Sequence, residues 1–428
     1  MGRLEAATTR SGTVASSQPW STDPDAYYAG IDAAVRDAGL DAPTLALDLT
    51  ALEHNIADLT ARAGGVPIRL ASKSLRVRSI IDDVVARDGF AGVLAFDVAE
   101  AQWLATESNI EDVLLGYPSV RRAALADLLA DEVALTRVTL LVDDVAQLDV
   151  VDSVVSPEHR SVVRVAIDLD ASLRLFSGRV HLGVRRSPVH DADAALTLAR
   201  AIVARPGFAL VGVMSYEAQV AGVADDVDGK PLMNRATRAM QRVSMLELRR
   251  RRGAIISSLR ELADIEIVNA GGTGSLEETA RDGSVTDIAA GSGLFGGHLF
   301  DGYRRFQPAP ALMFGLDVTR RPAPKIITCA GGGWIASGPP APDRLPRPVW
   351  PAGLSYIGTE AAGEVQTPLT GDAASNLVPG DRVWFRHTKS GEVCERARTV
   401  ALIGRDQTGQ ARVDDLVPTY RGEEKCYL

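Results

Sequence analysis

Eight short runs of β-branched and aliphatic residues recur between residues 67 and 293, and this repetition limits the fold more than any other feature of the sequence. Helical patterns lie between most of them. The runs are Pro67–Ser72, Gly92–Asp97, Asp112–Pro118, Val138–Asp144, Val162–Asp170, Ala209–Tyr216, Ile265–Thr273 and Val285–Gly293. Strands that alternate with helices eight times are typical of a closed parallel barrel rather than of an open sheet. We therefore predict an α/β fold, a (β/α)8 TIM barrel.

Three pairs of residues mark expected helix starts within this region. Thr50 with Glu53, Asp97 with Glu100, and Ser275 with Glu278 each have the spacing of a capping box. In that motif the first side chain accepts a hydrogen bond from the backbone of the first turn, and the acidic side chain bonds back. The pairs predict helices that begin beside these positions.

The residue composition and the pattern of apolar residues change after about Phe306. Glycine and proline become dense, as at Gly331–Gly333, and turn signals separate short strand-like runs. Examples of these runs are Lys325–Thr328, Arg382–Phe385 and Thr399–Ile403. Short strands between turns are typical of a β-rich domain.

The length of 428 residues suits a barrel of about 250 residues with a second domain. We predict a disordered or extended N-terminal arm over 1–41, a barrel over 42–306 and a β-rich domain over 307–428. One extra strand-like run, Thr44–Leu49, precedes the first barrel helix and is compatible with a place outside the barrel.

The composition excludes several classes of protein. The net charge of −9 argues against a nucleic-acid partner, and its simplest role is to keep the protein soluble. Three widely spaced cysteines argue against a disulfide scaffold and for a reducing compartment. The first 20 residues have no apolar core, and no apolar run reaches the ~18 residues of a membrane span. We expect a cytoplasmic protein without a membrane partner.

Lys73 is the first candidate for chemistry, because it directly follows the first barrel run in Ile68–Ser74. Active sites of this fold lie at the carboxyl ends of the strands. A lysine flanked by small residues there can be desolvated, which lowers its pKa and makes it a nucleophile toward an aldehyde. A surface lysine at a strand end is the alternative interpretation.

Two glycine-rich turns follow the seventh and eighth runs, at Asn269–Ser275 and Gly291–Gly293. Loops at these places form the usual phosphate site of such barrels, since glycine lets backbone N–H groups approach closely. The candidate phosphate-binding residues are Gly272, Thr273, Gly274, Ser275, Gly291 and Ser292. Two tight turns without a ligand are the alternative. A dinucleotide fingerprint is a poor match, because Glu277 stands where its third glycine belongs.

Two more strand ends carry polar residues. Tyr216 ends the sixth run and is a candidate to hydrogen-bond a cofactor or substrate; a core tyrosine with a satisfied hydroxyl is the alternative. In the fifth run, Arg164 and Asp168 share one parity, which predicts that both face the barrel lumen near the site. A buried structural ion pair is equally compatible with that pattern.

Together these residues resemble the fold-type III pyridoxal-5'-phosphate (PLP) enzymes. In that group an alanine-racemase-type barrel is joined to the β-domain of D-serine dehydratase and D-threonine aldolase, and its actinobacterial members are often called amino acid deaminase/aldolase. The resemblance covers roughly residues 42–428. Lys73–Ser74 stands where the family has its Schiff-base Lys-Thr, Glu100–Ala101 matches a Glu-Ala, and Tyr216–Gln219 matches Tyr-Asp-Gly-His with Gln219 in place of histidine.

The resemblance implies PLP held as an aldimine on Lys73, with the phosphate on the two glycine-rich turns. His181–Val184 falls where the family usually has Arg-x-Gly-Val, so His181 joins the cofactor-binding candidates. Related enzymes imply a homodimer in which the β-domain of one chain closes the barrel of the other.

A metal site is the remaining expectation from the resemblance. Gly380–Val383 matches a strand start that leads to a metal-binding His-x-Cys or His-x-Asp in the dehydratase and aldolase branch. Here the candidates are His387 and Cys394, seven residues apart, with Glu392 as a substitute ligand. Imidazole and thiolate suit Zn²⁺. The cofactor expectation is therefore PLP together with Zn²⁺ or Mn²⁺. A surface histidine and a structural cysteine are the alternative.

The functional hypothesis that follows is a PLP-dependent lyase, an aldolase or a dehydratase, acting on a D-configured or β-hydroxy amino acid. Lys73 and Tyr216 are its catalytic candidates. An amino acid racemase is the competing hypothesis and needs a second acid or base, for which Tyr356 is a weak candidate. A non-catalytic PLP-binding protein is a third, but that family lacks the large second domain.

Overall fold

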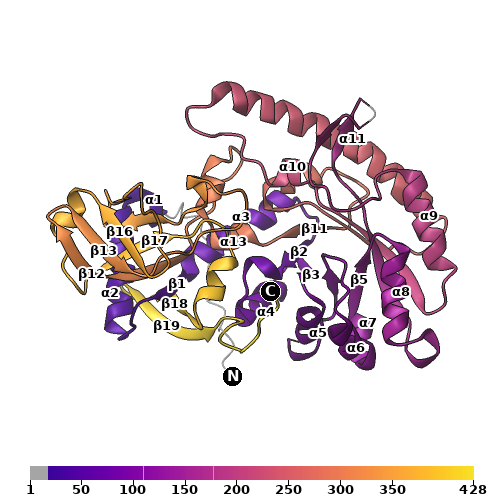
Figure 1. The fold of residues 1–428 in the computed structure, drawn as a ribbon, viewed down its shortest axis with the longest axis horizontal. Helices are drawn as coiled ribbons and strands as arrows, with labels where there is room; N and C mark the ends of the chain where they lie inside the picture. Colours follow the sequence, from indigo (N-terminus) through magenta and orange to yellow (C-terminus); the bar gives the residue numbers. More distant parts are fainter. Residues whose placement is uncertain (1–17, 109, 177) are drawn as a thin grey trace.

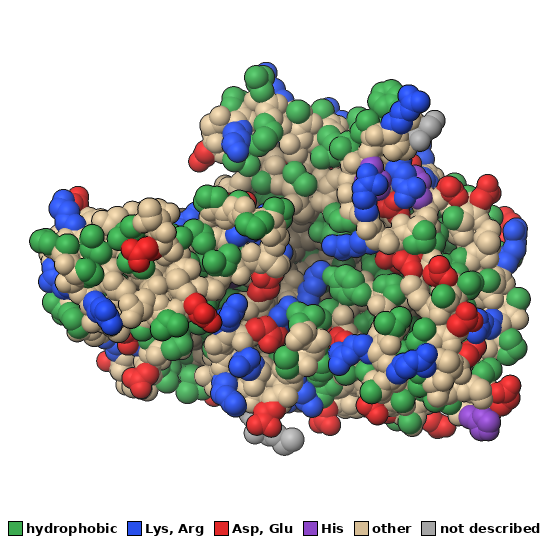
Figure 2. Space-filling model, viewed as in Figure 1, with side chains coloured by type: hydrophobic (Ala, Val, Ile, Leu, Met, Phe, Trp, Pro, Cys, Tyr) green, Lys and Arg blue, Asp and Glu red, His purple; other side chains and the backbone are tan. Residues whose placement is uncertain are grey.

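The computed structural model describes residues 18–428 except 109 and 177. The first 17 residues of the predicted N-terminal arm lie outside the described part of the chain. No helix in the described part is both long enough and apolar enough to cross a membrane. The face in Figure 2 carries interspersed acidic and basic side chains.

Eight parallel strands close into a barrel in the order β10-β11-β2-β3-β4-β5-β6-β9 (Figure 1). Each of the eight predicted runs overlaps one of these strands, so the predicted TIM barrel is confirmed. The barrel strands are β2 (Ile68–Ala71), β3 (Phe90–Ala95), β4 (Val113–Leu115), β5 (Val138–Val142), β6 (Val163–Asp168), β9 (Phe208–Ser215), β10 (Ile267–Ala270) and β11 (Asp287–Ala290).

Helices alternate with these strands along the chain and form the outer layer of the barrel. The longest, α11, is a single helix of 30 residues. The helices of the barrel part are α3 (Leu49–Ala63), α4 (Arg78–Val85), α5 (Val98–Glu107), α6 (Arg122–Ala130), α7 (Glu132–Arg137), α8 (Val145–Val154), α9 (Ala192–Val203), α10 (Ala218–Ala221), α11 (Pro231–Arg260), α12 (Leu276–Thr279) and α13 (Ser292–Phe295). A hairpin of β7 (Leu173–Leu175) and β8 (Val180–Leu182) follows β6.

The helix starts test the three predicted capping pairs. Asp97 caps α5 by accepting from the N–H of Ala99, as predicted, but Glu100 accepts from the N–H of Phe96 and not from that of Asp97, so the capping box is incomplete. The prediction for Thr50 is wrong, because Asp48 caps α3 and the N–H of Thr50 donates to it. Ser275 precedes α12 without capping it, because its hydroxyl serves the glycine-rich turn.

A nine-stranded mixed sheet forms the second domain. It contains the three strand-like runs predicted after Phe306. Its strands are β1 (Thr44–Asp48), β12 (Leu312–Ala323), β13 (Ile326–Ala330), β14 (Arg347–Trp350), β15 (Ser355–Tyr356), β16 (Gln366–Thr370), β17 (Arg382–Arg386), β18 (Thr399–Arg405) and β19 (Ala411–Pro418). The extra run at Thr44–Leu49 is β1, which pairs with β12 and β18, so this sheet draws a strand from the range predicted for the barrel.

The predicted disordered or extended arm is helical in its described part. A short helix α1 (Pro19–Thr22) is followed by α2 (Pro24–Asp37), which Asp23 caps. Tyr27, Tyr28, Ile31 and Val35 on α2 are buried in one cluster with Trp384 of the sheet. These side chains recur on one helix face, so burying that face offsets the entropy of ordering the segment.

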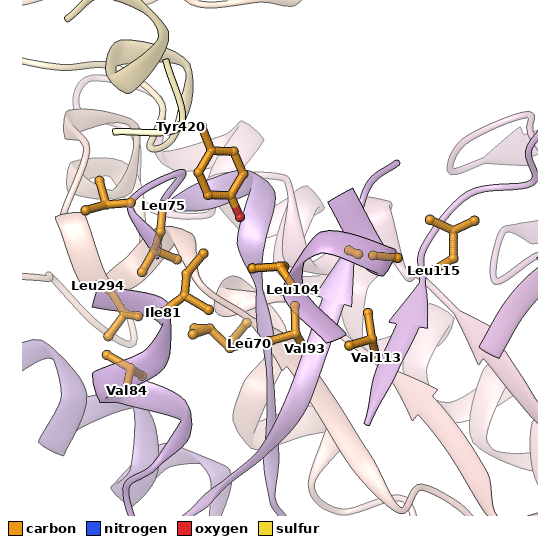
Figure 3. Packing of buried hydrophobic residues seen from close by; sticks show 14 of the residues in the cluster. Leu70, Leu75, Ile81, Val84, Val93, Leu104, Val113, Leu115, Leu294 and Tyr420 are labelled. Atoms are coloured by element: carbon orange, nitrogen blue, oxygen red, sulfur yellow. The ribbon is translucent and has the colours of Figure 1, made fainter. Parts of the chain in front are cut away.

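One apolar core runs from the barrel into the second domain. Figure 3 shows part of it, where Leu70 and Val93 of neighbouring strands lie beside Leu104 of α5, and Leu294 of α13 lies beside Ile81 of α4. Tyr420, from the segment after β19, packs into the same cluster. The second domain is therefore anchored beside the strand ends at which the candidate residues lie.

Candidate active site

Lys73 lies in a 3-10 turn, Ser72–Ser74, immediately after β2, at the carboxyl end of the barrel. Its ammonium donates a hydrogen bond to the hydroxyl of Tyr117, 2.6 Å away, and Tyr117 follows β4. The side chain of Lys73 is exposed, whereas the sequence predicted a desolvated amine. The amine is thus exposed to solvent and not desolvated.

The second domain holds the turn that carries Lys73. The guanidinium of Arg76 donates to the carbonyl of Lys73 at 3.2 Å and pairs with Glu395 at 2.9 Å. Gly391 packs against the same carbonyl with φ of +90°, and a Cβ there would overlap the carbonyl oxygen of Lys73. Only glycine combines this conformation with this approach. Sequence reasoning missed both Arg76 and Gly391.

Glu100 is fully buried beneath this turn. Its carboxylate accepts hydrogen bonds from the N–H of Phe96 at 2.7 Å and from the hydroxyl of Tyr420 at 2.8 Å. Burial raises the pKa of Glu100 to about 7. The segment after β19 is therefore joined to the barrel through an acid that titrates near neutrality.

The two glycine-rich turns meet in the structure. The hydroxyl of Ser292 donates to the hydroxyl oxygen of Thr273 at 3.1 Å, and the N–H of Gly293 points to the same oxygen at 3.3 Å. A 3-10 turn begins at Thr273 and α13 begins at Ser292. The first N–H groups of such turns have no partner within them, so they are suitable donors for a phosphate. With an accessible Lys73 nearby, these residues fit PLP.

Not every residue of the two turns is free for a ligand. The hydroxyl of Ser275 accepts from the N–H of Gly272 at 3.1 Å and is therefore used inside the turn. A Cβ on Gly272 would lie 2.9 Å from the Cβ of Ala221, and one on Gly291 would lie 2.7 Å from the carbonyl oxygen of Ala71. These two glycines are required for packing, whatever they bind.

A buried charge network that the sequence did not predict supports the first turn. Glu217 accepts from the N–H of Gly271 at 3.0 Å and from the hydroxyl of Thr279 at 2.5 Å. Arg252 of α11 lies 3.8 Å from Glu217 and pairs with Asp282 at 2.7 Å. Glu217 and Arg252 are both fully buried. Arg252 belongs to a run of four arginines, and nothing in the sequence separates it from its neighbours.

At the barrel mouth, a small cavity is lined by Tyr117, Asp168, Arg186 and Tyr216. The guanidinium of Arg186 lies 6.0 Å from the centroid of the Tyr216 ring. Burial, and then the nearby charge of Asp143, raise the pKa of Asp168 to about 7. Burial also raises the pKa of Tyr216. Tyr117 and Arg186 were missed, although Tyr117 stands in a predicted strand-end position.

Two predicted residues do not reach this cavity. Arg164 pairs with Glu266 at 2.7 Å, at the amino end of the strands, so it forms neither a site with Asp168 nor an ion pair with it. His181 lies on β8, and its Nε2 is 3.0 Å from the carbonyl oxygen of Val184. It lines an outer hollow with Arg174 and Arg185 instead.

The donor set does not fit a metal at the predicted place. Both ring nitrogens of His387 have hydrogen-bond partners. Nδ1 lies 2.9 Å from the carbonyl oxygen of Leu312, and Nε2 lies 3.1 Å from the hydroxyl oxygen of Ser390. Burial raises the pKa of the Cys394 thiol to about 12. Both oxygens of Glu392 accept hydrogen bonds from Ser337. In the described part of the chain no three His, Cys, Asp or Glu residues gather as a metal site would need.

Comparisons with known proteins agree with this geometry. A family model described as the alanine racemase N-terminal domain matches residues 47–298, more than half of the chain. The 3-hydroxy-D-aspartate aldolase of Paracoccus denitrificans (strain Pd 1222) is 26% identical over 291 residues, which are 64% of this chain and 66% of that enzyme. The D-threonine aldolase of an Arthrobacter species is 27% identical over 316 residues, 71% of this chain and 76% of that enzyme.

Among solved structures, the D-threonine aldolase of Filomicrobium marinum superposes with a TM-score of 0.71 and 22% identity, covering 89% of this chain and 95% of that one. At this identity the likeness shows a shared fold. The chain spans slightly less than two thirds of the length of the Paracoccus enzyme that it matches.

Proposed function

The chain belongs to the alanine racemase N-terminal domain family, as the resemblance of its motifs implied, and we propose that it is a PLP-dependent lyase for β-hydroxy amino acids of D configuration. The observation that carries the proposal is that the turn of the exposed Lys73 packs against Gly291, while the next residue, Ser292, bonds to Thr273 of the other glycine-rich turn. The family implies the cofactor, and relatives named as D-threonine and 3-hydroxy-D-aspartate aldolases support the reaction class and substrate.

In this proposal Lys73 holds the cofactor covalently, and the N–H groups at Thr273 and Ser292 hold its phosphate. When bound, PLP supplies an electron sink for negative charge that develops at the substrate's Cα. The hydroxyl of Tyr117 orients Lys73 through their 2.6 Å hydrogen bond. Once the substrate amine has displaced it, Lys73 would donate the proton that Cα gains after the Cα–Cβ bond breaks, and the proton that Asp168 takes from the β-hydroxyl would restore the balance.

The substrate's β-hydroxyl needs a base for aldol cleavage, and Asp168 is the residue best suited to that role. Its carboxyl lines the cavity beside Tyr117, and a pKa of about 7 makes it able to hold or release a proton at neutral pH. As the carboxylate takes the hydroxyl proton, the Cα–Cβ bond breaks and an aldehyde leaves. No step of this scheme uses a metal ion, because the side chains of His387 and Glu392 are already engaged in hydrogen bonds within the protein.

A substrate panel tests the proposal. PLP-loaded protein is offered D- and L-threonine, D- and L-serine and the 3-hydroxyaspartates, and aldehyde, ammonia and optical rotation are read separately. We expect aldehyde from the D-β-hydroxy acids and none from a Lys73→Ala control. Loss of optical rotation without aldehyde or ammonia would instead favour the racemase. A racemase receives no support from Tyr356, whose hydroxyl donates to the carbonyl of Pro346 at 2.7 Å. The homodimer is part of the same proposal, and sedimentation equilibrium tests it.

A further inference from the structure

A second cavity lies beside the glycine-rich turn at Gly274, and the proposed reaction does not involve it. It encloses about 330 Å³, and sites for small ligands begin at about 300 Å³. Its walls come from α10 and the loop after it, from α11, from the turn at Gly274 and from residues 303–306. It shares no lining residue with the cavity at Tyr117, and neither Thr273 nor Ser292 lines it. The second cavity is therefore separate from the place proposed for the cofactor and the substrate.

Asp225 stands out in the wall of this cavity, because its carboxylate is buried without a cationic partner among the described residues. The residue is only 7% exposed. Oδ1 accepts a hydrogen bond from the N–H of Arg304 at 3.0 Å, and none of the described residues donates to Oδ2. Arg238 donates to the backbone carbonyl of Asp225 at 2.5 Å, but its ion pair, at 3.9 Å, is with Asp226. A buried carboxylate without a countercharge costs free energy, so Asp225 is suited to receive an ammonium group.

Guanidinium groups line the same cavity. Arg242 of α11 and Arg304 are exposed, and neither forms an ion pair with a described residue. The other carboxylate of the cavity, Glu278, is already engaged by three arginines, among them Arg305 at 2.7 Å. Other exposed arginines of α11, such as Arg235, also lack an ion pair. What sets Arg242 and Arg304 apart is that they line one cavity together with a buried carboxylate that has no countercharge.

One part of the cavity wall is apolar. Val220, Tyr303 and Phe306 line it, and all three are buried. The rings of Tyr303 and Phe306 lie with their centroids 5.3 Å apart, and the hydroxyl of Tyr303 already donates to the carbonyl of Ala221 at 3.1 Å. An aliphatic group in the cavity would bury apolar surface against these side chains.

We infer that this cavity binds a free amino acid with an aliphatic side chain. Its ammonium would pair with Asp225, its carboxylate with Arg242 and Arg304, and its side chain would lie against the apolar wall. An inorganic anion would leave Asp225 without a countercharge and would be repelled by it, and a simple amine would leave the guanidinium groups without one. Because Gly274 belongs to the turn proposed for the cofactor phosphate, the bound amino acid would contact that turn. The inference goes beyond the proposed function and does not rest on it.

Three ligands that share one branched carbon skeleton test the inference. L-Valine carries both charges, 3-methylbutanoate lacks the ammonium, and 2-methylpropylamine lacks the carboxylate. Their binding is measured by isothermal titration calorimetry on PLP-loaded protein that has been reduced with borohydride, because the reduced cofactor no longer forms a bond with an added amine. We expect saturable binding of L-valine at one site per chain. Each of the other two ligands should bind at least about 10-fold more weakly, since each loses one charged hydrogen-bonded pair.

Two variants show whether the bound L-valine is in this cavity. Asp225→Asn and Arg242→Gln should each weaken L-valine by about 10- to 100-fold, the range for loss of a charged hydrogen-bonded pair. Asparagine still offers an oxygen to the N–H of Arg304, so the loop should keep its conformation. The matched control is Arg235→Gln, at an exposed residue of the same helix that does not line the cavity. This control should bind L-valine as the wild type does.

Absence of saturable L-valine binding would overturn the inference, as would binding that Asp225→Asn leaves unchanged. If 3-methylbutanoate bound as tightly as L-valine, the cavity would be a simple anion site and the inference would be wrong as well. Failure of the lyase proposal gives a different result. The substrate panel would then yield neither aldehyde nor ammonia, while the comparison of L-valine binding in the variants would still decide the role of this cavity.

Discussion

The barrel mouth and the loop after β17 in the second domain each contain residues suited to cofactor or metal chemistry, but their environments differ. At the mouth, the amine of Lys73 is exposed, and the two glycine-rich turns bond to each other through Ser292 and Thr273. In the loop, His387 and Cys394 are buried, and both ring nitrogens of His387 already have protein partners. Residue type alone therefore does not identify a site. Position at a strand end of the barrel adds the information that a residue faces the mouth.

The largest expected effect is a loss of stability in the barrel, caused by removing one of the buried charges that support the glycine-rich turn at Gly271. Arg252→Met removes the partner of Asp282 and leaves that carboxylate and Glu217 without a countercharge. Removing one member of a buried ion pair costs about 3–5 kcal/mol. Urea unfolding should show that loss, together with weaker PLP binding. Arg250→Met, at an exposed neighbour on α11, serves as the control and should change neither quantity by much. An unaffected Arg252→Met would mean that the network does not support the turn.

The next effect lies where the two regions join, at Glu100 and Tyr420. The pKa of Glu100 is about 7 in the folded chain against an ordinary 4.5, so the folded state holds its proton over that interval and the unfolded state does not. A raised acid pKa therefore stabilises the fold below pH 4.5, and the contribution is lost as the pH rises to 7. The loss corresponds to about 3 kcal/mol.

The difference in free energy of unfolding between wild type and Glu100→Gln isolates this contribution, because glutamine does not titrate. Measured from pH 4.5 to 7.5 by urea unfolding, wild type should lose stability relative to the variant. A difference that stays constant across this range would contradict the raised pKa.

A smaller effect is expected at Cys394 in the second domain, and the opposite result would remove the contrast between this domain and the barrel mouth. Cys394→Ala truncates a buried side chain and should cost about 1 kcal/mol of stability, as should the control Cys329→Ala at another buried thiol. Both variants should keep lyase activity within about threefold, and EDTA should not inactivate the wild type. Inactivation by EDTA that Zn²⁺ reverses, and that Cys394→Ala makes permanent, would restore a metal site to the second domain.

The same contrast explains what could be predicted from the sequence. The barrel repeats one unit eight times, so hydrophobic runs located its strands, and strand ends located Lys73, Tyr216 and the glycine-rich turns. The second sheet has no repeating unit, and β1 reaches it from more than 260 residues away in the chain through its pairing with β12. Residues such as Arg186 and Gly391 were missed because their roles depend on contacts between distant segments, which no local pattern records.

The central claim is that the carboxyl ends of the barrel strands hold PLP on Lys73. Borohydride reduction of the PLP-loaded protein, followed by proteolysis and mass spectrometry, tests it most directly. The account predicts one modified peptide, the one that contains Lys73, and no modified peptide in Lys73→Ala. Lys389 is the sharpest competitor, because it lies two residues from Gly391, which packs on the carbonyl of Lys73. A label on Lys389, or a label that persists in Lys73→Ala, would contradict the account.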